Sequence, residues 1–204
     1  MDILYNLIIL IIAYLLGSIN TSIIVSKILI GDDIRNHGSG NAGATNTLRT
    51  VGKKGALFVV LGDVLKAVVA ILIAKLISDS PVAVYIAGIG AVLGHNFPLY
   101  FKFKGGKGII VSAVAILFAD PVLGLITVAA AILIMAISRY VSLGSILGAV
   151  LFVILAIVFR TPDTEFIICA AMLTLLAVYM HRSNISRLLA GKENKLSFGS
   201  KEEK

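Results

Sequence analysis

Long apolar segments separated by short polar ones dominate the pattern of this chain. Seven apolar segments are predicted to form helices, over residues 3–29, 56–77, 82–97, 109–119, 122–138, 143–159 and 164–180. A helix that crosses a bilayer needs about 20 mostly apolar residues, and most of these segments approach that length. The segment 109–119 is shorter, roughly 17 Å as a helix, but Asp120 and Pro121 separate it from the next one. The pattern therefore predicts an all-α membrane protein with seven transmembrane helices.

The composition excludes most soluble folds. Hydrophobic residues make up 58% of the 204 residues and charged residues only 14%, whereas soluble domains are roughly 45–50% apolar and about 25% charged. We therefore expect residues 1–204 to form a single integral membrane domain. The one cysteine, Cys169, excludes an internal disulfide. The first segment does not resemble a secretory signal, because Asp2 stands where a signal has basic residues and no small-residue cleavage site follows.

The distribution of lysine and arginine predicts the orientation. Fourteen of the 18 basic residues fall in alternate polar segments: Arg35, Arg49, Lys53, Lys54, Lys102, Lys104, Lys107, Arg139, Arg182, Arg187, Lys192, Lys195, Lys201 and Lys204. Basic loops accumulate on the cytoplasmic side of membrane proteins, so we expect the N-terminus outside and the C-terminus inside. One tilted helix over 109–138 would place the basic tail outside, which favours two helices there. We attribute the net charge of +7 to these loops and the lipid bilayer, and expect no nucleic-acid partner.

Residues 35–49, RNHGSGNAGATNTLR, are the first of three polar stretches that predict a functional site. Glycines among small polar residues let the backbone approach an anion, and an arginine can hold a phosphate by two hydrogen bonds. The candidate phosphate-binding residues are Ser39, Gly40, Asn41, Gly43, Thr45, Asn46 and Arg49. A plain flexible linker is the alternative. The glycine spacing at 38–43 also matches a dinucleotide fingerprint, but no strand precedes it, so we reject that match.

The second stretch, residues 94–108, ends in a basic glycine turn that opens the next helix. Free amides at a helix N-terminus favour an anion. We take His95, Gly105, Gly106 and Lys107 as phosphate-binding candidates and Lys104 as a catalytic one. The turn lacks the upstream glycine and the following Ser or Thr of a Walker loop. Taken alone, its lysines are equally compatible with side chains that reach from the bilayer edge to water.

The third stretch begins at His181. At helical spacing, Asn184 shares one face with His181 and also lies beside Arg187. His181 and Asn184 are catalytic candidates, Arg187 is a phosphate-binding candidate, and Glu193 is expected to provide structural support. A basic amphipathic tail lying on anionic lipid is the alternative, although such a tail has no need of His, Asn and Glu.

Two charged residues, Asp63 and Lys66, lie one turn apart inside the predicted span 56–77. Ionisable residues within a membrane are costly and usually face a partner or a cavity. An ion pair at this spacing lets each charge partly neutralise the other. We expect the pair to support the polar loops structurally rather than to act in catalysis.

Together these stretches resemble the PlsY family, the membrane acyl-phosphate:glycerol-3-phosphate acyltransferases of bacteria. The carrying motifs run along the whole chain: GSGNAGATNTLR at 38–49, GDVLK at 62–66, GHNFPLYFKFKGGKG at 94–108, SLG at 142–144 and HRSNISRLLAGKE at 181–193. The resemblance implies transfer of a fatty acyl group from acyl phosphate to the 1-hydroxyl of glycerol 3-phosphate. The products would be lysophosphatidic acid and phosphate, in the first acylation of phospholipid biosynthesis. It also implies a cytoplasmic active site in the bacterial cell membrane and adds Ser142 as a binding candidate.

The residues also bear on mechanism. No aspartate follows a histidine at the spacing used by acyltransferases that take thioesters, and Cys169 lies in an apolar run. We therefore expect direct attack without an acyl-enzyme, and no cofactor or metal. Acyl phosphate is already activated, so neither His95 nor His181 is expected to be an essential base, and His181 suits donating a hydrogen bond to a phosphate.

An anion or phosphate transporter is the alternative function, although the chain lacks the internal repeats usual in transporters. We expect a monomer or a weak oligomer.

Overall fold

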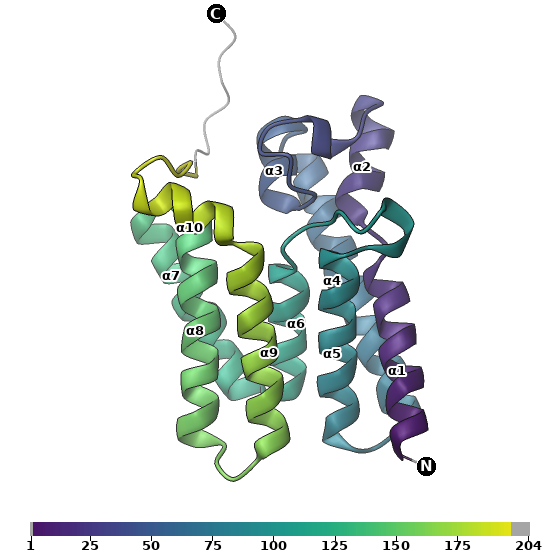
Figure 1. Ribbon diagram of the computed structural model, residues 1–204. Coiled ribbons are helices and arrows are strands. Elements are labelled where there is room, and N and C mark those ends of the chain that lie inside the picture. The colour runs from purple at the N-terminus through teal and green to yellow at the C-terminus, as the bar shows by residue number, and fades with distance from the viewer. Residues whose placement is uncertain (1, 197–204) are drawn as a thin grey trace, which may run out of the picture.

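The computed structural model describes residues 2–196, which form helices joined by short loops (Figure 1). The segments are α1 (Asp2–Gly17), α2 (Thr21–Ile30), η1 (Ile34–Asn36), α3 (Ala44–Thr50), α4 (Lys53–Ile77), α5 (Pro81–Asn96), η2 (Leu99–Phe101), α6 (Ile109–Ala119), α7 (Pro121–Ser138), α8 (Val141–Phe159), α9 (Thr164–Met180) and α10 (Arg182–Leu189). Residues 2–196 contain no strand, which confirms the all-α class. Two residues of the predicted basic tail, Lys201 and Lys204, lie outside the described residues.

Several of these helices are long and apolar enough to cross a membrane. Within the described residues there are five such segments: Ile3–Ile30, Lys53–Ile77, Pro81–Phe101, Pro121–Ser138 and Val141–Phe159. A sixth is added if Thr164–Met180 and Arg182–Leu189, which meet at a 60° bend, are taken as one broken span. Ile109–Ala119 is apolar but shorter. The chain is thus a multi-pass membrane protein, and the number seven stays a prediction.

The first predicted helix, 3–29, is interrupted. α1 ends at Gly17 and α2 begins at Thr21, with the side chain of Asn20 accepting a hydrogen bond from Ile23 N at 3.1 Å as an N-cap. The carbonyl of Ile19 accepts a hydrogen bond from Lys66 Nζ at 2.9 Å. The hydropathy pattern missed this break because its stabilising partner lies 47 residues further along the chain.

The predicted break at Asp120 is confirmed. The Asp120 carboxylate accepts hydrogen bonds from the amides of Val122 and Leu123 at 2.9 and 3.0 Å, and so starts α7. The chain then reverses direction, and α6 and α7 pack against each other. They approach so closely that a Cβ on Gly124 would come within 2.9 Å of the Leu117 backbone. Arg160, from the loop after α8, pairs with the same carboxylate through its Nε at 2.6 Å.

Small residues build the centre of the bundle. α1 and α5 approach so closely that a Cβ on Gly17 would meet the carbonyl of Ala91, and one on Gly94 would meet that of Tyr14. Close backbone contact through small residues is how membrane helices associate when lipid removes the hydrophobic drive. Many large apolar side chains face outward, such as Leu76 at 87% exposure. An exterior of this kind requires lipid around it.

The polar segments gather at one end of the bundle. η1, α3, η2 and α10 all lie at the upper end in Figure 1, opposite the N-terminus. Their mutual contacts include a hydrogen bond from Arg49 to the carbonyl of Asn194 at 3.4 Å and one from Lys107 to Asn184. The sequence analysis described these regions as loops and a tail, and the short helices α3 and α10 were not predicted as separate elements. The expected convergence of the polar stretches is nevertheless found.

Single-cysteine labelling tests which side this end faces. In a Cys169→Ala background, Lys104→Cys and Lys195→Cys should react with an impermeant thiol reagent only from the cytoplasmic side of cells or inverted vesicles. Asp79→Cys, in the loop between α4 and α5 at the other end, should react only from outside. Labelling of Lys195→Cys from outside would contradict the proposed orientation, because the tail must share a side with the other basic loops.

Candidate active site

A cavity of about 500 Å³ lies at the polar end, between the glycine-rich loop, the start of α6, the start of α8 and the α9–α10 junction. The residues expected from the sequence that line it are Ser39, Gly40, Asn41, Gly43, Thr45, Asn46, Arg49, Asp63, His95, Lys107, Ser142, His181, Asn184, Arg187 and Glu193. Four further expected residues, Lys66, Lys104, Gly105 and Gly106, are outside this lining. The fold therefore brings all three polar stretches to one space.

Asn46 holds the glycine-rich loop in shape from within. Its side-chain oxygen accepts a hydrogen bond from Ser39 N at 2.9 Å, and its amide nitrogen donates to the carbonyl of His37 at 2.9 Å. Gly38 and Gly40 both have positive φ, at 58° and 71°, which favours glycine there. Asn46 is 1% exposed, so it acts mainly as a support of the loop.

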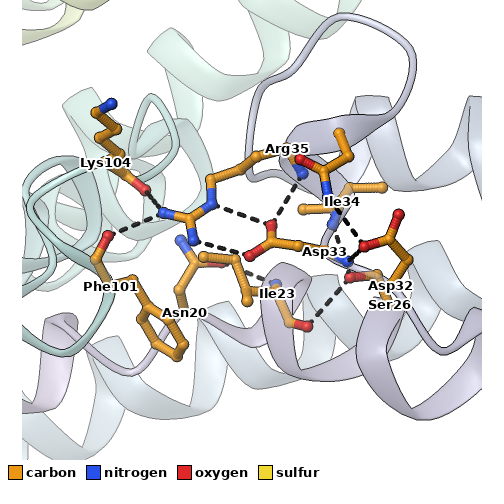
Figure 2. A network of polar contacts seen from close by, with 10 residues as sticks. Asn20, Ile23, Ser26, Asp32, Asp33, Ile34, Arg35, Phe101 and Lys104 are labelled. Atoms are coloured by element: carbon orange, nitrogen blue, oxygen red, sulfur yellow. Dashed lines mark hydrogen bonds and ion pairs between the residues drawn. The ribbon is translucent and has the colours of Figure 1, made fainter.

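Arg35 ties the glycine-rich loop to the second polar loop (Figure 2). Its guanidinium bonds both oxygens of Asp33, at 3.0 and 2.8 Å, and donates to the carbonyls of Phe101 and Lys104 at 2.8 and 3.0 Å. Hydrogen bonding to Arg35 lowers the pKa of Asp33 and keeps the carboxylate charged. One planar side chain thus fixes the distance between two loops.

The glycine turn rests on the C-terminal end of α5. Gly105 N and Gly106 N donate to the carbonyls of Asn96 and His95, each at 3.1 Å. A Cβ on Gly106 would meet the His95 ring, so the turn cannot approach this closely with a larger residue. Lys104 has an exposed side chain that is directed away from the Arg35 network in Figure 2. Its expected catalytic role therefore gains no support from the cavity geometry.

Glu193 organises the far wall of the cavity. Its Oε1 accepts hydrogen bonds from Asn184 Nδ2 at 2.7 Å and from Ser142 Oγ at 3.0 Å, and its Oε2 accepts from Arg187 Nε at 2.8 Å. Burial raises the pKa of Glu193, but the three hydrogen bonds outweigh it and lower the pKa overall. A single carboxylate thereby orients three side chains expected at the site.

Lys107 is the cation that enters the cavity most directly from the second loop. Its Nζ donates to Asn184 Oδ1, so Asn184 is held between Lys107 and Glu193. Burial lowers the pKa of Lys107 to about 8, with Glu193 opposing and Arg187 and Arg49 adding to the shift. An ammonium surrounded by other cations in a partly dry site is well suited to an anionic ligand.

His181 is held against the last turn of α9 by a backbone contact of its ring. Its Nδ1 lies 2.7 Å from the carbonyl of Ala177, and a carbonyl only accepts, so Nδ1 carries the proton. In the neutral ring Nε2 then offers a lone pair. The sequence-based prediction that His181 donates a hydrogen bond to a phosphate did not include this contact with the last turn of α9.

Comparisons with known proteins agree with this arrangement. Residues 7–191 match the protein family described as glycerol-3-phosphate acyltransferase. The chain belongs to the glycerol-3-phosphate acyltransferase family. The proteins of that name from Thermoanaerobacter sp. strain X514 and Clostridioides difficile strain 630 are 49% and 47% identical to it. The first match covers 95% of this chain and 96% of the relative, and the second covers 100% of both.

Solved structures of the family share the fold. A crystal structure of PlsY, an integral membrane glycerol 3-phosphate acyltransferase, in its glycerol 3-phosphate form is 38% identical, with a TM-score of 0.86. It covers 94% of this chain and 96% of that one. The lysophosphatidic acid form of PlsY gives a TM-score of 0.83 at 36% identity, with 94% and 95% covered. The resemblance inferred from the motifs is confirmed.

The apolar part of this acyltransferase's cavity wall is not predictable from the sequence. Its members are Ile109, Ile110, Met135, Val141 and Met180, and further polar lining comes from Ser145, Arg182, Ser183 and Asn194. The apolar residues carry no signal in the sequence, because they belong to segments that already have to be apolar. Only the side-by-side packing of α6, α7, α8 and α9, with one end of each at the polar end of the bundle, places them together.

Replacing Arg35 tests the tie between the loops. Arg35→Lys keeps a charge near Asp33 but lacks the planar fork needed for two further carbonyl contacts. We expect amide hydrogen exchange of residues 99–108 to accelerate by about tenfold, equivalent to about one hydrogen bond from a charged group. Arg160→Lys, which alters an arginine–aspartate pair at the opposite end, is the matched control. Unchanged exchange in 99–108 would show that Arg35 does not hold the loops.

Proposed function

We propose that this protein transfers a fatty acyl group from acyl phosphate to the 1-hydroxyl of glycerol 3-phosphate, releasing lysophosphatidic acid and inorganic phosphate. One observation carries the proposal: candidate phosphate-binding residues from three separate loops line a single cavity at the end of a membrane bundle. The relatives are named for glycerol-3-phosphate acylation, and two PlsY structures are described as glycerol 3-phosphate and lysophosphatidic acid forms.

Both substrates carry a phosphate, and the cavity offers two groups of phosphate-binding residues. The glycine-rich loop supplies backbone amides and the side chains of Ser39 and Arg49. Arg49 is exposed and donates to the carbonyl of Asn194 at 3.4 Å. The opposite side supplies Lys107, Arg187 and the first amides of α6. Two phosphates can therefore bind with an acyl carbonyl between them.

The reaction needs little help from a strong base. The hydroxyl oxygen attacks the carbonyl carbon, the bond from that carbon to the phosphate oxygen breaks, and the hydroxyl proton passes to a phosphate oxygen. Before the attack, His181 Nε2 accepts the hydrogen bond of the hydroxyl and so orients its oxygen. As the oxygen–carbon bond forms, the O–H turns to the phosphate oxygen that takes the proton, and Lys107 stabilises charge on the leaving phosphate. Asn184, itself held by Glu193, keeps Lys107 in place, and the carbonyl of Ala177 holds the His181 ring.

The apolar substrate chain accounts for the location in the membrane. A smaller apolar pocket of about 70 Å³ lies between α6, α7, α8 and α9 and shares Ile109 and Ser145 with the main cavity. Its lining continues toward the bilayer interior through Phe152 and Leu173. This continuity supports a donor whose head lies among the polar loops while its tail remains in an apolar environment.

The membrane topology and the oligomeric state are part of the same proposal. A single domain crosses the bacterial cell membrane seven times, with the N-terminus outside and the cavity facing the cytoplasm, as a monomer or a weak oligomer. The grouping of the basic loops at one end of the bundle supports this orientation. The short α6, the fourth crossing in chain order, completes the set of seven. It packs against α4, α5, α7 and α9 rather than facing lipid alone.

Phosphate release by the purified protein tests the reaction. Acyl phosphate with glycerol 3-phosphate should give inorganic phosphate and lysophosphatidic acid in equal amounts, and omission of glycerol 3-phosphate should stop both. The control uses Lys107→Ala, which should lose most of the activity while keeping the same elution profile. Uptake of phosphate into vesicles without acylation would instead support an anion transporter.

His181 substitutions test how the hydroxyl is oriented. His181→Ala should lower kcat/KM by about 10–100-fold, within the range of a hydrogen bond to a reacting group. His181→Gln, whose carbonyl oxygen can still accept, should retain measurably more activity. If both variants fall equally by about 10²–10⁴-fold in kcat with KM unchanged, and the acidic limb of the pH profile disappears, His181 is an essential base instead.

The pKa of Lys107 predicts an alkaline limb. Below pH 8 the ammonium binds the phosphate, and above it the neutral amine does not, so kcat/KM should fall as pH rises through about 8. Measurements between pH 7 and 9.5 keep the substrate phosphate fully ionised, since its second pKa is about 6. In Lys107→Arg the limb should vanish because arginine stays charged. An unchanged limb would assign it to another group.

A further inference from the structure

Lys66 has a complete set of partners beneath the cavity. Its Nζ lies 2.8 Å from Asp63 Oδ1, 2.9 Å from His95 Nδ1 and 2.9 Å from the carbonyl of Ile19. The side chain is 6% exposed and belongs to α4, whereas the last two partners come from α5 and the break between α1 and α2. A lysine ammonium has three N–H donors and no acceptor, so these three contacts use all of its hydrogen-bonding capacity.

This arrangement determines which nitrogen of His95 carries the proton. Because Lys66 can only donate, His95 Nδ1 must accept and therefore has no hydrogen. Asp63 Oδ1 is a poorer partner for the same nitrogen, at 3.5 Å. The neutral ring is then protonated at Nε2, an assignment that follows from its hydrogen-bond partners.

The Nε2 edge is the part of His95 left for the cavity. His95 is one of the cavity-lining residues although it is only 3% exposed. Nε2 is the atom that a Cβ on Gly106 would meet first, so it lies against the glycine turn. Across residues 2–196 no hydrogen bond to Nε2 is formed. His181, by contrast, has its proton on Nδ1, held by Ala177, and an accepting Nε2.

We infer that Lys66 and Asp63 are positioning residues that hold His95 as an Nε2–H donor toward a phosphate oxygen of a bound substrate. The identity of that ligand, glycerol 3-phosphate, rests on the proposed function. The two histidines then have different roles: His95 donates a hydrogen bond to an anion, and His181 accepts one from a hydroxyl. The buried pair in α4 serves the reaction through His95.

Nitrogen NMR of the unaltered protein tests the tautomer directly. The chain has three histidines, so protein labelled with ¹⁵N at histidine gives few ring signals, and the His95 signals are those lost in His95→Gln. We expect Nδ1 of His95 to show the shift of a nitrogen without a proton, and Nε2 that of an N–H. Saturation with glycerol 3-phosphate should move the Nε2 signal, with the half-buried His37, which pairs with Asp32, as an internal reference. A proton on Nδ1, or an Nε2 signal that glycerol 3-phosphate leaves in place, overturns the inference.

Kinetics separate donation at Nε2 from simple packing. A glutamine amide reaches the position of Nε2, whereas an asparagine amide reaches only that of Nδ1. His95→Asn should therefore lower kcat/KM for glycerol 3-phosphate by about 10–100-fold, mainly through KM, and His95→Gln should recover at least part of that loss. Equal losses in the two variants would contradict a donor at Nε2.

A double substitution tests whether Lys66 acts through His95. Asp63→Asn with Lys66→Gln removes both charges together, so that no unpaired charge remains buried. In the native background the double substitution should mix the two His95 tautomers in the NMR spectrum and lower kcat/KM. In the His95→Gln background, which has no tautomer to fix, it should cost at least about threefold less. Equal cost in both backgrounds would show a purely structural role.

These outcomes stay distinct from failure of the proposed reaction. The tautomer is read without turnover, so it holds or fails whether or not acyl phosphate is the donor. Conversely, a protein that releases phosphate and forms lysophosphatidic acid but carries the His95 proton on Nδ1 would support the function and refute this inference.

Discussion

The ammonium of Lys66, buried inside α4, is the interaction around which the polar end of this bundle is organised. A buried charge is tolerated only when it is paired and fully hydrogen-bonded. Here the partners are a carboxylate on the same helix, an imidazole on α5 and a carbonyl freed by the break between α1 and α2. Removing any one of them would leave an unsatisfied group at membrane depth, so the three segments are held in one arrangement.

The polar loops around the cavity are stabilised in the same way, because each charged side chain there bonds several partners. Arg35 connects Asp33 to two carbonyls of the second loop, and Glu193 connects Ser142, Asn184 and Arg187. Because glycine-rich loops have little side-chain packing of their own, such shared contacts replace a hydrophobic core. The result is a cavity in which cations and donors are fixed before a ligand arrives, which lowers the cost of ordering them on binding.

The membrane determines where this cavity can lie. Within hydrocarbon every backbone group must be satisfied by regular structure, so irregular, glycine-rich backbone is confined to the end of the bundle or to protein-lined space. The apolar exterior and the close contact of α1 with α5 follow from the same environment. The proposed donor, with a phosphate head and an acyl tail, has matching requirements: polar loops line the main cavity, and an apolar pocket between α6 and α9 adjoins it.

The sequence by itself determined the helical class, the break at Asp120 and the three polar stretches, because hydropathy, proline and glycine act over a few residues. It also found most of the cavity lining, since anion-binding chemistry requires recognisable residue types. Only the tertiary structure decided the break after Gly17, the protonated nitrogens of His95 and His181, the exposure of Lys104 and the apolar wall around Met135. Each of these depends on a partner far away in the chain: Lys66 for the break and for His95, the end of α9 for His181, and four aligned helices for the wall. Local patterns cannot encode such contacts, because the free energy that selects them arises only when the segments are packed together.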